Sequence, residues 1–298
     1  MTLTDLETVV AGGHALTRAQ AERVLASADL VTTGELGETA RKARTGDLVT
    51  FGRVVEVSGG AIPENTGEAG EVRIMGAPTS VEDACERTRA AAAIASGLPV
   101  TGFSLADLAA LTGADSAALT AAARALSEAG LAAVAEVPAD AFGSVEDLVA
   151  AVEAARRGGL GAWRVTVNRA TMHERLDLIE RVVRLQRTSG DVRAFAPLPR
   201  LDPPDEPSTG YDDVRTVAIA RLMAADIPVI QVDWPLYGPK LAQVAIAYGA
   251  GDIDGVAPVD APALGPRRAA RAEIERQIRA ASAVPVERNG RYERHHAR

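Results

Sequence analysis

The sequence alternates short runs of β-branched residues with longer Ala-rich segments, and this alternation constrains the fold more than any other feature. Because strands that alternate with helices pair in parallel, eight of them favour an α/β fold of the (β/α)8 TIM-barrel type. A doubly wound sheet needs a glycine fingerprint that this sequence lacks. The predicted strands are 48–57, 71–77, 98–104, 130–137, 163–168, 191–197, 228–234 and 253–258. The predicted helices between and after them are 80–96, 105–112, 115–129, 144–158, 171–188, 212–225, 239–248 and 266–282.

The chain length agrees with one barrel. Its 298 residues fall within the range of about 200 to 400 that such barrels span, and a hydrophobic fraction of 47% can fill a core. We expect a short N-terminal helical extension over 1–47, the barrel over 48–265, and a C-terminal helix and tail packed on the barrel over 266–298.

Charge and hydropathy exclude several classes of partner. With 32 basic and 40 acidic residues the net charge is −8, which disfavours nucleic acid because phosphates need a basic surface. Apolar runs are too short to cross a bilayer, and residues 1–7 do not resemble a signal peptide. The preference for Ala and for Arg over Lys is typical of a GC-rich bacterial genome. We therefore expect a cytoplasmic bacterial protein with no membrane or nucleic-acid partner.

The cysteine, histidine and lysine residues limit the kinds of catalysis that the chain can perform. Cys85 is the only cysteine, so the chain cannot form an internal disulfide, a Cys-based zinc site or an iron–sulfur cluster on its own thiolates. Its position among apolar residues of a predicted helix favours an inert, buried thiol. No histidine pair ends a predicted strand, and Lys42 and Lys240 lie outside the strands, which disfavours catalytic metals and Schiff-base chemistry. We expect neither a metal nor a cofactor.

Barrel enzymes take their catalytic side chains from the C-terminal ends of the strands. Glu56 and Glu136 lie at two of these predicted ends, and we assign their carboxylates to acid–base catalysis. Arginines near carboxylates suit a small anionic ligand, although any single charge at a loop start can equally be a solvated surface charge. The predicted substrate-binding residues are Asn168, Arg169, Arg200 and Asp233, with Trp234 and Tyr237 as a stacking surface.

Residues 208–258 are the most distinctive region. The runs Tyr211–Met223, Ile227–Trp234, Gly238–Ala245 and Tyr248–Gly255 together resemble the C-terminal half of aminofutalosine synthase, cyclic dehypoxanthinyl futalosine synthase and the FO synthase subunits. The resemblance implies a radical S-adenosylmethionine (SAM) barrel, and the first two enzymes act in the futalosine route to menaquinone. Weaker similarity covers nearly all of the chain, including Gly46–Phe51, Val100–Ser104, Ala196–Pro199 and Val284–Arg288.

The departures from this family bear on function. Where the family carries a Cys-x-x-x-Cys-x-x-Cys loop for its [4Fe–4S] cluster, residues 52–70 contain no cysteine. The Gly-rich stretch after the second strand is reduced to Gly76-Ala77-Pro78, which disfavours SAM binding. Asn168-Arg169-Ala170 replaces the Gly-His that often follows the fifth strand. The resemblance therefore implies a divergent member without the cluster and without radical chemistry.

Three functions follow as alternatives. The first is a non-radical paralogue in menaquinone biosynthesis, acting as a partner or regulator of a futalosine-pathway enzyme or as a homo-oligomer. The second is a cofactor-independent lyase, isomerase or hydrolase acting on an anionic aromatic or nucleoside substrate at the barrel mouth. The third is a non-catalytic protein that binds a small ligand.

Overall fold

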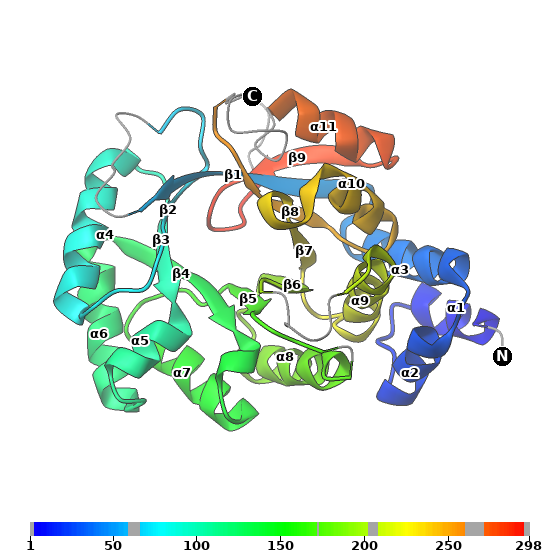
Figure 1. Ribbon diagram of the computed structural model, residues 1–298, viewed down its shortest axis with the longest axis horizontal. Helices are drawn as coiled ribbons and strands as arrows, with labels where there is room; N and C mark the ends of the chain where they lie inside the picture. Colours follow the sequence, from blue (N-terminus) through cyan, green and yellow to red (C-terminus); the bar gives the residue numbers. More distant parts are fainter. Residues whose placement is uncertain (1–2, 59–65, 172, 202–207, 260–270, 295–298) are drawn as a thin grey trace.

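The computed structural model describes residues 3–58, 66–171, 173–201, 208–259 and 271–294, and Figure 1 shows their arrangement as strands surrounded by helices. Within this part of the chain, eight parallel strands form a closed barrel, because β1 pairs with β2 on one side and with β8 on the other. The predicted (β/α)8 barrel is therefore confirmed. Its strands are β1 Leu48–Val57, β2 Glu71–Ile74, β3 Val100–Ser104, β4 Leu131–Pro138, β5 Arg164–Val167, β6 Ala194–Pro199, β7 Val229–Asp233 and β8 Asp252–Val256.

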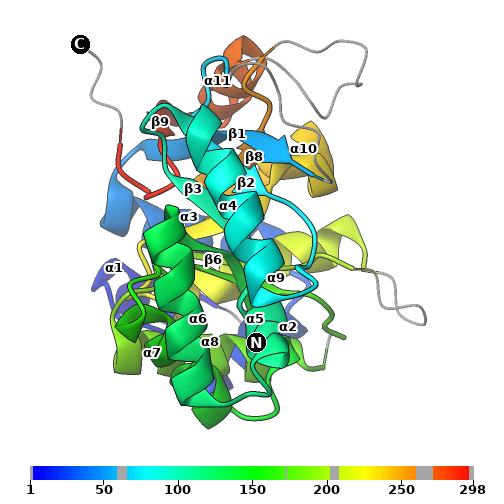
Figure 2. The ribbon, with the colours of Figure 1, turned by 90° about the vertical axis from the view of Figure 1, so that its left-hand side faces the viewer.

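The helices of the barrel lie outside the strands, as the view of α4 and α6 in Figure 2 shows. Side-chain caps explain where several of them begin: Ser80, Asp115 and Ser144 each accept a hydrogen bond from a backbone N–H of the following first turn. The helices are α4 Val81–Ala95, α5 Leu105–Leu111, α6 Ser116–Ala129, α7 Val145–Arg157, α8 Arg175–Ser189, α9 Gly210–Met223, α10 Trp234–Ala247 and α11 Arg271–Ala280. No helix among the described residues combines the length and apolarity needed to cross a membrane.

Three helices precede the barrel, namely α1 Thr4–Ala11, α2 Arg18–Ala26 and α3 Leu30–Thr45. The extension is joined to the barrel by a backbone hydrogen bond of 2.9 Å from Leu16 N to Leu222 O. It also depends on glycine: a Cβ at Gly37 would lie 2.4 Å from the carbonyl oxygen of Tyr248, so only glycine permits this approach. The predicted boundary at residue 265 lies outside the described residues.

Two predicted helix starts differ from the structure. Thr171 and Glu174 do interact, but their hydrogen bonds form a turn ahead of α8, which begins at Arg175. The helix expected from residue 239 begins at Trp234, directly after β7, and contains a kink at Gly238 with a positive φ of 76°. The sequence pattern placed Trp234 at a strand end because the kink interrupts the helical spacing.

The C-terminal strand β9 Val284–Arg288 was not predicted. It pairs in parallel with the first half of β1, from Leu48↔Val284 to Gly52↔Arg288, whereas β2 pairs with the second half of β1. The two strands thus share β1, and β9 fills the opening that the short β2 leaves at the N-terminal end of the barrel. Pro285 within the run weakens the strand signal, since proline is tolerated only at strand edges.

Candidate active site

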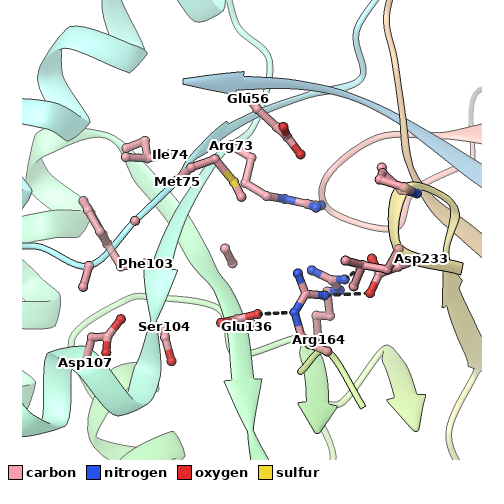
Figure 3. A pocket seen from close by; sticks show the side chains of 17 residues that line it. Glu56, Arg73, Ile74, Met75, Phe103, Ser104, Asp107, Glu136, Arg164 and Asp233 are labelled. Atoms are coloured by element: carbon pink, nitrogen blue, oxygen red, sulfur yellow. Dashed lines mark hydrogen bonds and ion pairs between the residues drawn. The ribbon is translucent and has the colours of Figure 1, made fainter. Parts of the chain in front are cut away.

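A cavity of about 240 Å³ opens at the C-terminal ends of the barrel strands, and we call it the mouth cavity. Charged side chains from most of the strands face it (Figure 3). This is the end of the barrel at which α/β-barrel enzymes carry out their chemistry. The charged residues that line it are Glu56, Arg73, Asp107, Glu136, Arg164, Arg200 and Asp233.

A continuous chain of ion pairs runs along one side of the mouth cavity. Arg200 Nε lies 3.2 Å from Glu136 Oε2, and Arg200 Nη1 donates to Asp233 Oδ2 at 2.6 Å. The other oxygen of Asp233 accepts a hydrogen bond of 2.6 Å from Arg164 Nη2. Figure 3 shows Glu136 pointing toward this group of arginines. Arg200 is the more accessible of the two guanidinium groups, with 21% of its side chain exposed against 4% for Arg164, so Arg200 is the better placed to meet an anionic ligand.

Asp107 supplies a second kind of carboxyl group. It lies in the first turn of α5, directly after β3, and Figure 3 shows it beside Ser104, across the cavity from the arginines. Burial raises the pKa of the Asp107 carboxyl, and the negative charge of Glu136 raises it further. Two carboxyl groups in different electrostatic environments can act as acid and base in one reaction.

A buried network of ion pairs lies inside the barrel, next to the mouth cavity. Arg73 donates to Asp254 at 2.7 Å and to Glu71 at 2.8 Å, and Arg288 donates to Asp254 at 2.8 Å. Burial alone would raise the pKa of Asp254, but the charges of Arg73, Arg164 and Arg288 outweigh it and hold that pKa well below its usual value. Barrel interiors are more often filled by Val, Ile and Leu. Here the ion pairs hold the cavity-lining arginines in fixed positions.

The rim of the mouth cavity contains a strained residue. Phe103, in β3, adopts a positive φ of 61°, which is uncommon for a residue with a side chain. The guanidinium of Arg87 lies 5.0 Å from the centroid of the Phe103 ring and donates to the carbonyl oxygens of Met75 and Gly76 at 2.6 and 3.2 Å. Arg87 therefore joins the loop after β2 to the ring, and both line the cavity.

The structure brings four of the predicted site residues to the mouth cavity: Glu56, Glu136, Arg200 and Asp233. Sequence reasoning missed Asp107, Arg73 and Arg164. Asp107 could have been found as the first acidic residue after a predicted strand end. Arg73 and Arg164 could not, because each lies inside a strand, where an arginine is not expected to face the barrel interior.

The other four predicted residues do not line the cavity. Trp234 is fully buried, so its ring is not a stacking surface; as the first residue of α10 it packs into the core. Tyr237 is half-buried and its hydroxyl donates to the carbonyl oxygen of Pro199. The backbone N–H groups of Asn168 and Arg169 donate to the Asp140 carboxylate at 2.8 and 2.7 Å, which fixes the loop after β5 beside the mouth.

The residues of this chain do not fit an iron–sulfur cluster. Such clusters take three or four thiolates as a rule, and the sequence contains Cys85 alone. Cys85 is buried on α4, and burial raises the pKa of its thiol, which disfavours the thiolate form. Across the described ranges, no three His, Cys, Asp or Glu side chains are grouped so that they could hold a metal ion.

No protein-family model matches the chain. Its sequence is similar to aminodeoxyfutalosine synthase from Thermus thermophilus, with 35% identity over 41% of this chain and 37% of that protein, and to the same enzyme from Streptomyces coelicolor, with 32% identity over 40% and 36%. It is also similar to 5-amino-6-(D-ribitylamino)uracil–L-tyrosine 4-hydroxyphenyl transferase 2 from Methanosarcina mazei, with 30% identity over 50% and 44%. The matched region thus spans less than half the length of each of these relatives.

The fold is shared over nearly the whole chain with solved structures. The hydrogenase maturase HydG from Carboxydothermus hydrogenoformans superposes with a TM-score of 0.66 over 97% of this chain and 80% of its own, at 12% identity. Methylornithine synthase (PylB) superposes with a TM-score of 0.63 over 95% of this chain and 97% of its own, at 14% identity. At this identity the likeness establishes the barrel fold.

Proposed function

We propose that this chain is a non-radical relative of aminodeoxyfutalosine synthase that keeps the barrel and a small-molecule site but works without an iron–sulfur cluster. The sequence similarity to two such synthases supports the relationship. The single cysteine supports the loss of the cluster, because no other side chain supplies the thiolate ligands that such a cluster takes.

The reaction we propose is acid–base catalysis at the mouth cavity. The observation that carries it is the pair of Asp107 and Glu136, which line one cavity while the pKa of Asp107 is raised. Asp107 would donate a proton to the substrate and Glu136 would accept one, as in a lyase or isomerase. Arg200 would bind an anionic group of the substrate through the edge that remains accessible beside Glu136 and Asp233.

The size of the mouth cavity limits the substrate. Small-molecule sites usually enclose about 300 to 1,000 Å³, so a cavity of about 240 Å³ suits a compact polar molecule or one part of a larger one. Because the chain is similar to two aminodeoxyfutalosine synthases, we propose that this molecule belongs to the futalosine route to menaquinone. Association with a futalosine-pathway enzyme, in the cytoplasm of a bacterium, remains part of this proposal.

Catalysis is tested by a ligand screen followed by product analysis. Futalosine-type and chorismate-derived compounds are first tested for thermal stabilisation of the protein, and those that stabilise it are incubated and analysed for new products. We expect turnover with the native chain, a loss of at least about a hundredfold for Asp107→Asn and for Glu136→Gln, and no loss for the exposed control Glu128→Gln on α6. Stabilisation without turnover would instead identify a ligand-binding protein.

The relationship to the pathway and the absence of a cluster have separate tests. Deletion of the gene is expected to lower the menaquinone content of the cells, and normal menaquinone would contradict the pathway assignment. After anaerobic reconstitution with iron and sulfide, we expect less than about 0.1 bound iron atom per chain. A stoichiometric [4Fe–4S] spectrum would overturn the proposal that the cluster is lost.

A further inference from the structure

A second cavity, of about 350 Å³, lies at the opposite end of the barrel from the mouth, and we call it the floor cavity. Its wall includes Leu48 and Thr50 of β1, Val229 at the start of β7 and Gly251 just before β8, all at the N-terminal ends of strands. The end of α3 and residues 291–294, which follow β9, complete it. Its volume exceeds that of the mouth cavity and falls in the range of about 300 to 1,000 Å³ that is typical of small-molecule sites.

The floor cavity concentrates positive charge in a protein that is acidic as a whole. Four arginines line it, and Glu293 is the only carboxylate among the described lining residues. In the described ranges none of the four arginines forms an ion pair, in contrast to Arg73, Arg164 and Arg288 inside the barrel. The four are Arg44, Arg193, Arg291 and Arg294.

The polar contacts of these arginines leave their charge uncompensated. Arg44 Nη2 donates to the backbone carbonyl of Asp226 at 2.9 Å, and Arg193 Nη1 donates to the backbone carbonyl of Arg291. A carbonyl satisfies a hydrogen-bond donor but brings no negative charge. The buried Arg221 adds to the positive potential: burial and the charge of Arg44 lower its pKa to about 10, although Asp226 opposes this.

An aromatic ring holds two of the arginines in place. The Trp163 side chain is 7% exposed, and the guanidinium carbon of Arg193 lies 4.2 Å from a centroid of its ring system. Arg291 lies over the same side chain at 5.8 Å. Such cation–π contacts restrict the side chains before a ligand arrives, which lowers the entropy lost on binding. Arg193 and Arg291, two of the four arginines, are therefore restrained before a ligand binds.

We propose that the floor cavity binds a phosphorylated small molecule through Arg44, Arg193, Arg291 and Arg294. A guanidinium group matches the geometry of two phosphate oxygens, and a phosphate would compensate the excess positive charge. This site lies at the end of the barrel away from Glu136 and Asp107, so binding there does not depend on the chemistry at the mouth.

Isothermal titration calorimetry with inorganic phosphate, pyrophosphate and AMP tests the proposal. We expect saturable binding of at least one of the three, with a Kd at least tenfold higher in Arg44→Gln/Arg291→Gln. The matched control Arg124→Gln removes a charge from α6, on the other side of the barrel from α3 (Figure 1), and is expected to change Kd less than twofold.

A variant that should bind the anions more tightly provides the sharpest check. Glu293→Gln removes the negative charge but retains an oxygen that can accept from Asn289 Nδ2, so we expect phosphate-containing ligands to bind more tightly. Circular dichroism establishes that each variant is folded. If Arg44→Gln/Arg291→Gln unfolds, the single variants Arg291→Lys and Arg291→Gln replace it. The Kd of Arg291→Lys, which keeps the charge, should rise less than that of Arg291→Gln. The proposal is overturned if none of the three anions binds the native chain, or if Arg44→Gln/Arg291→Gln and Arg124→Gln bind equally.

Discussion

Arg288 on β9 forms a two-pronged ion pair with Asp252 on β8: Nε lies 2.7 Å from Oδ2 and Nη2 lies 2.8 Å from Oδ1. Both side chains are buried, with 1% of Arg288 and 0% of Asp252 exposed. Arg288 also stacks on Tyr292, whose ring centroid lies 4.2 Å from the guanidinium carbon. The pair therefore joins the C-terminal strand to the strand that completes the barrel.

Arg288→Met is expected to lower the free energy of unfolding by about 3–5 kcal/mol, because it leaves the buried Asp252 without its arginine partner and removes one of the three arginines around Asp254. Urea unfolding followed by circular dichroism measures this value. The exposed Arg276→Met on α11 serves as the control and should cost less than about 1 kcal/mol. A loss below about 1 kcal/mol for Arg288→Met would show that the network does not hold β9 in place.

Gly52→Ala should disturb the ion pair between Arg288 and Asp252, because the added methyl group takes up space beside it. A Cβ at Gly52 would lie 2.6 Å from Arg288 Nη1, and the bidentate contact with Asp252 prevents the guanidinium from moving aside. We expect a loss of about 1–3 kcal/mol in the free energy of unfolding. Gly210→Ala at the start of α9 meets no atom within 4 Å and is expected to be neutral or stabilising by up to about 1 kcal/mol. Equal effects of the two changes would contradict the close approach.

Arg164 and Arg200 both form ion pairs with Asp233, and substituting each in turn should separate the effect on stability from the effect on ligand binding. Arg164→Met removes a nearly inaccessible charge partner of Asp233 and is expected to cost about 3–5 kcal/mol of unfolding free energy. Arg200→Met affects a more exposed side chain and should cost less than about 2 kcal/mol, while ligand affinity at the mouth falls at least tenfold. Chemical unfolding and thermal-shift titration measure the two quantities. Unchanged affinity in folded Arg200→Met would remove Arg200 from the binding site.

Asp107 should make stability depend on pH with a defined sign. Because its pKa is raised in the folded state, the folded form binds its proton more strongly than the unfolded form does. The stability that this proton contributes is complete below the pKa of the Asp107 carboxyl in the unfolded chain. It is lost as the pH rises through the pKa of the same carboxyl in the folded chain. Asp107→Asn, which is neutral at every pH, should therefore gain stability relative to the native chain as the pH rises above about 4.

Asp5→Asn is the matched control for this experiment, with the opposite sign. Hydrogen bonds from Arg23 lower the pKa of the Asp5 carboxyl, so its contribution is present above the unfolded pKa and lost as the pH falls through the folded pKa. Urea unfolding between about pH 2 and pH 5 should show Asp5→Asn losing stability relative to the native chain as the pH rises. If Asp107→Asn followed the same trend, the raised pKa of Asp107 would be wrong.

The barrel strands were predictable because each is a short β-branched run between helical segments, and every predicted strand overlaps an observed one. Strand β9 was not predictable, since Val284–Arg288 contains a proline and its pairing with Leu48–Gly52 joins opposite ends of the chain. The mouth residues show the same division. Glu56 and Glu136 follow from strand ends, whereas Arg73 and Arg164 acquire their place only when strands far apart in sequence bring Asp254 and Asp233 to them.

The amino-acid sequence by itself determined the alternating strands and helices, the strand ends that carry Glu136, Arg200 and Asp233, and the single cysteine that cannot hold a cluster. Tertiary structure alone decided that Trp234 is buried, that Asp107 shares a cavity with Glu136, and that four arginines meet at the floor of the barrel. The physical reason is that periodicity and strand ends are properties of neighbouring residues. Burial, pKa and charge compensation depend on groups that only the closed barrel brings together.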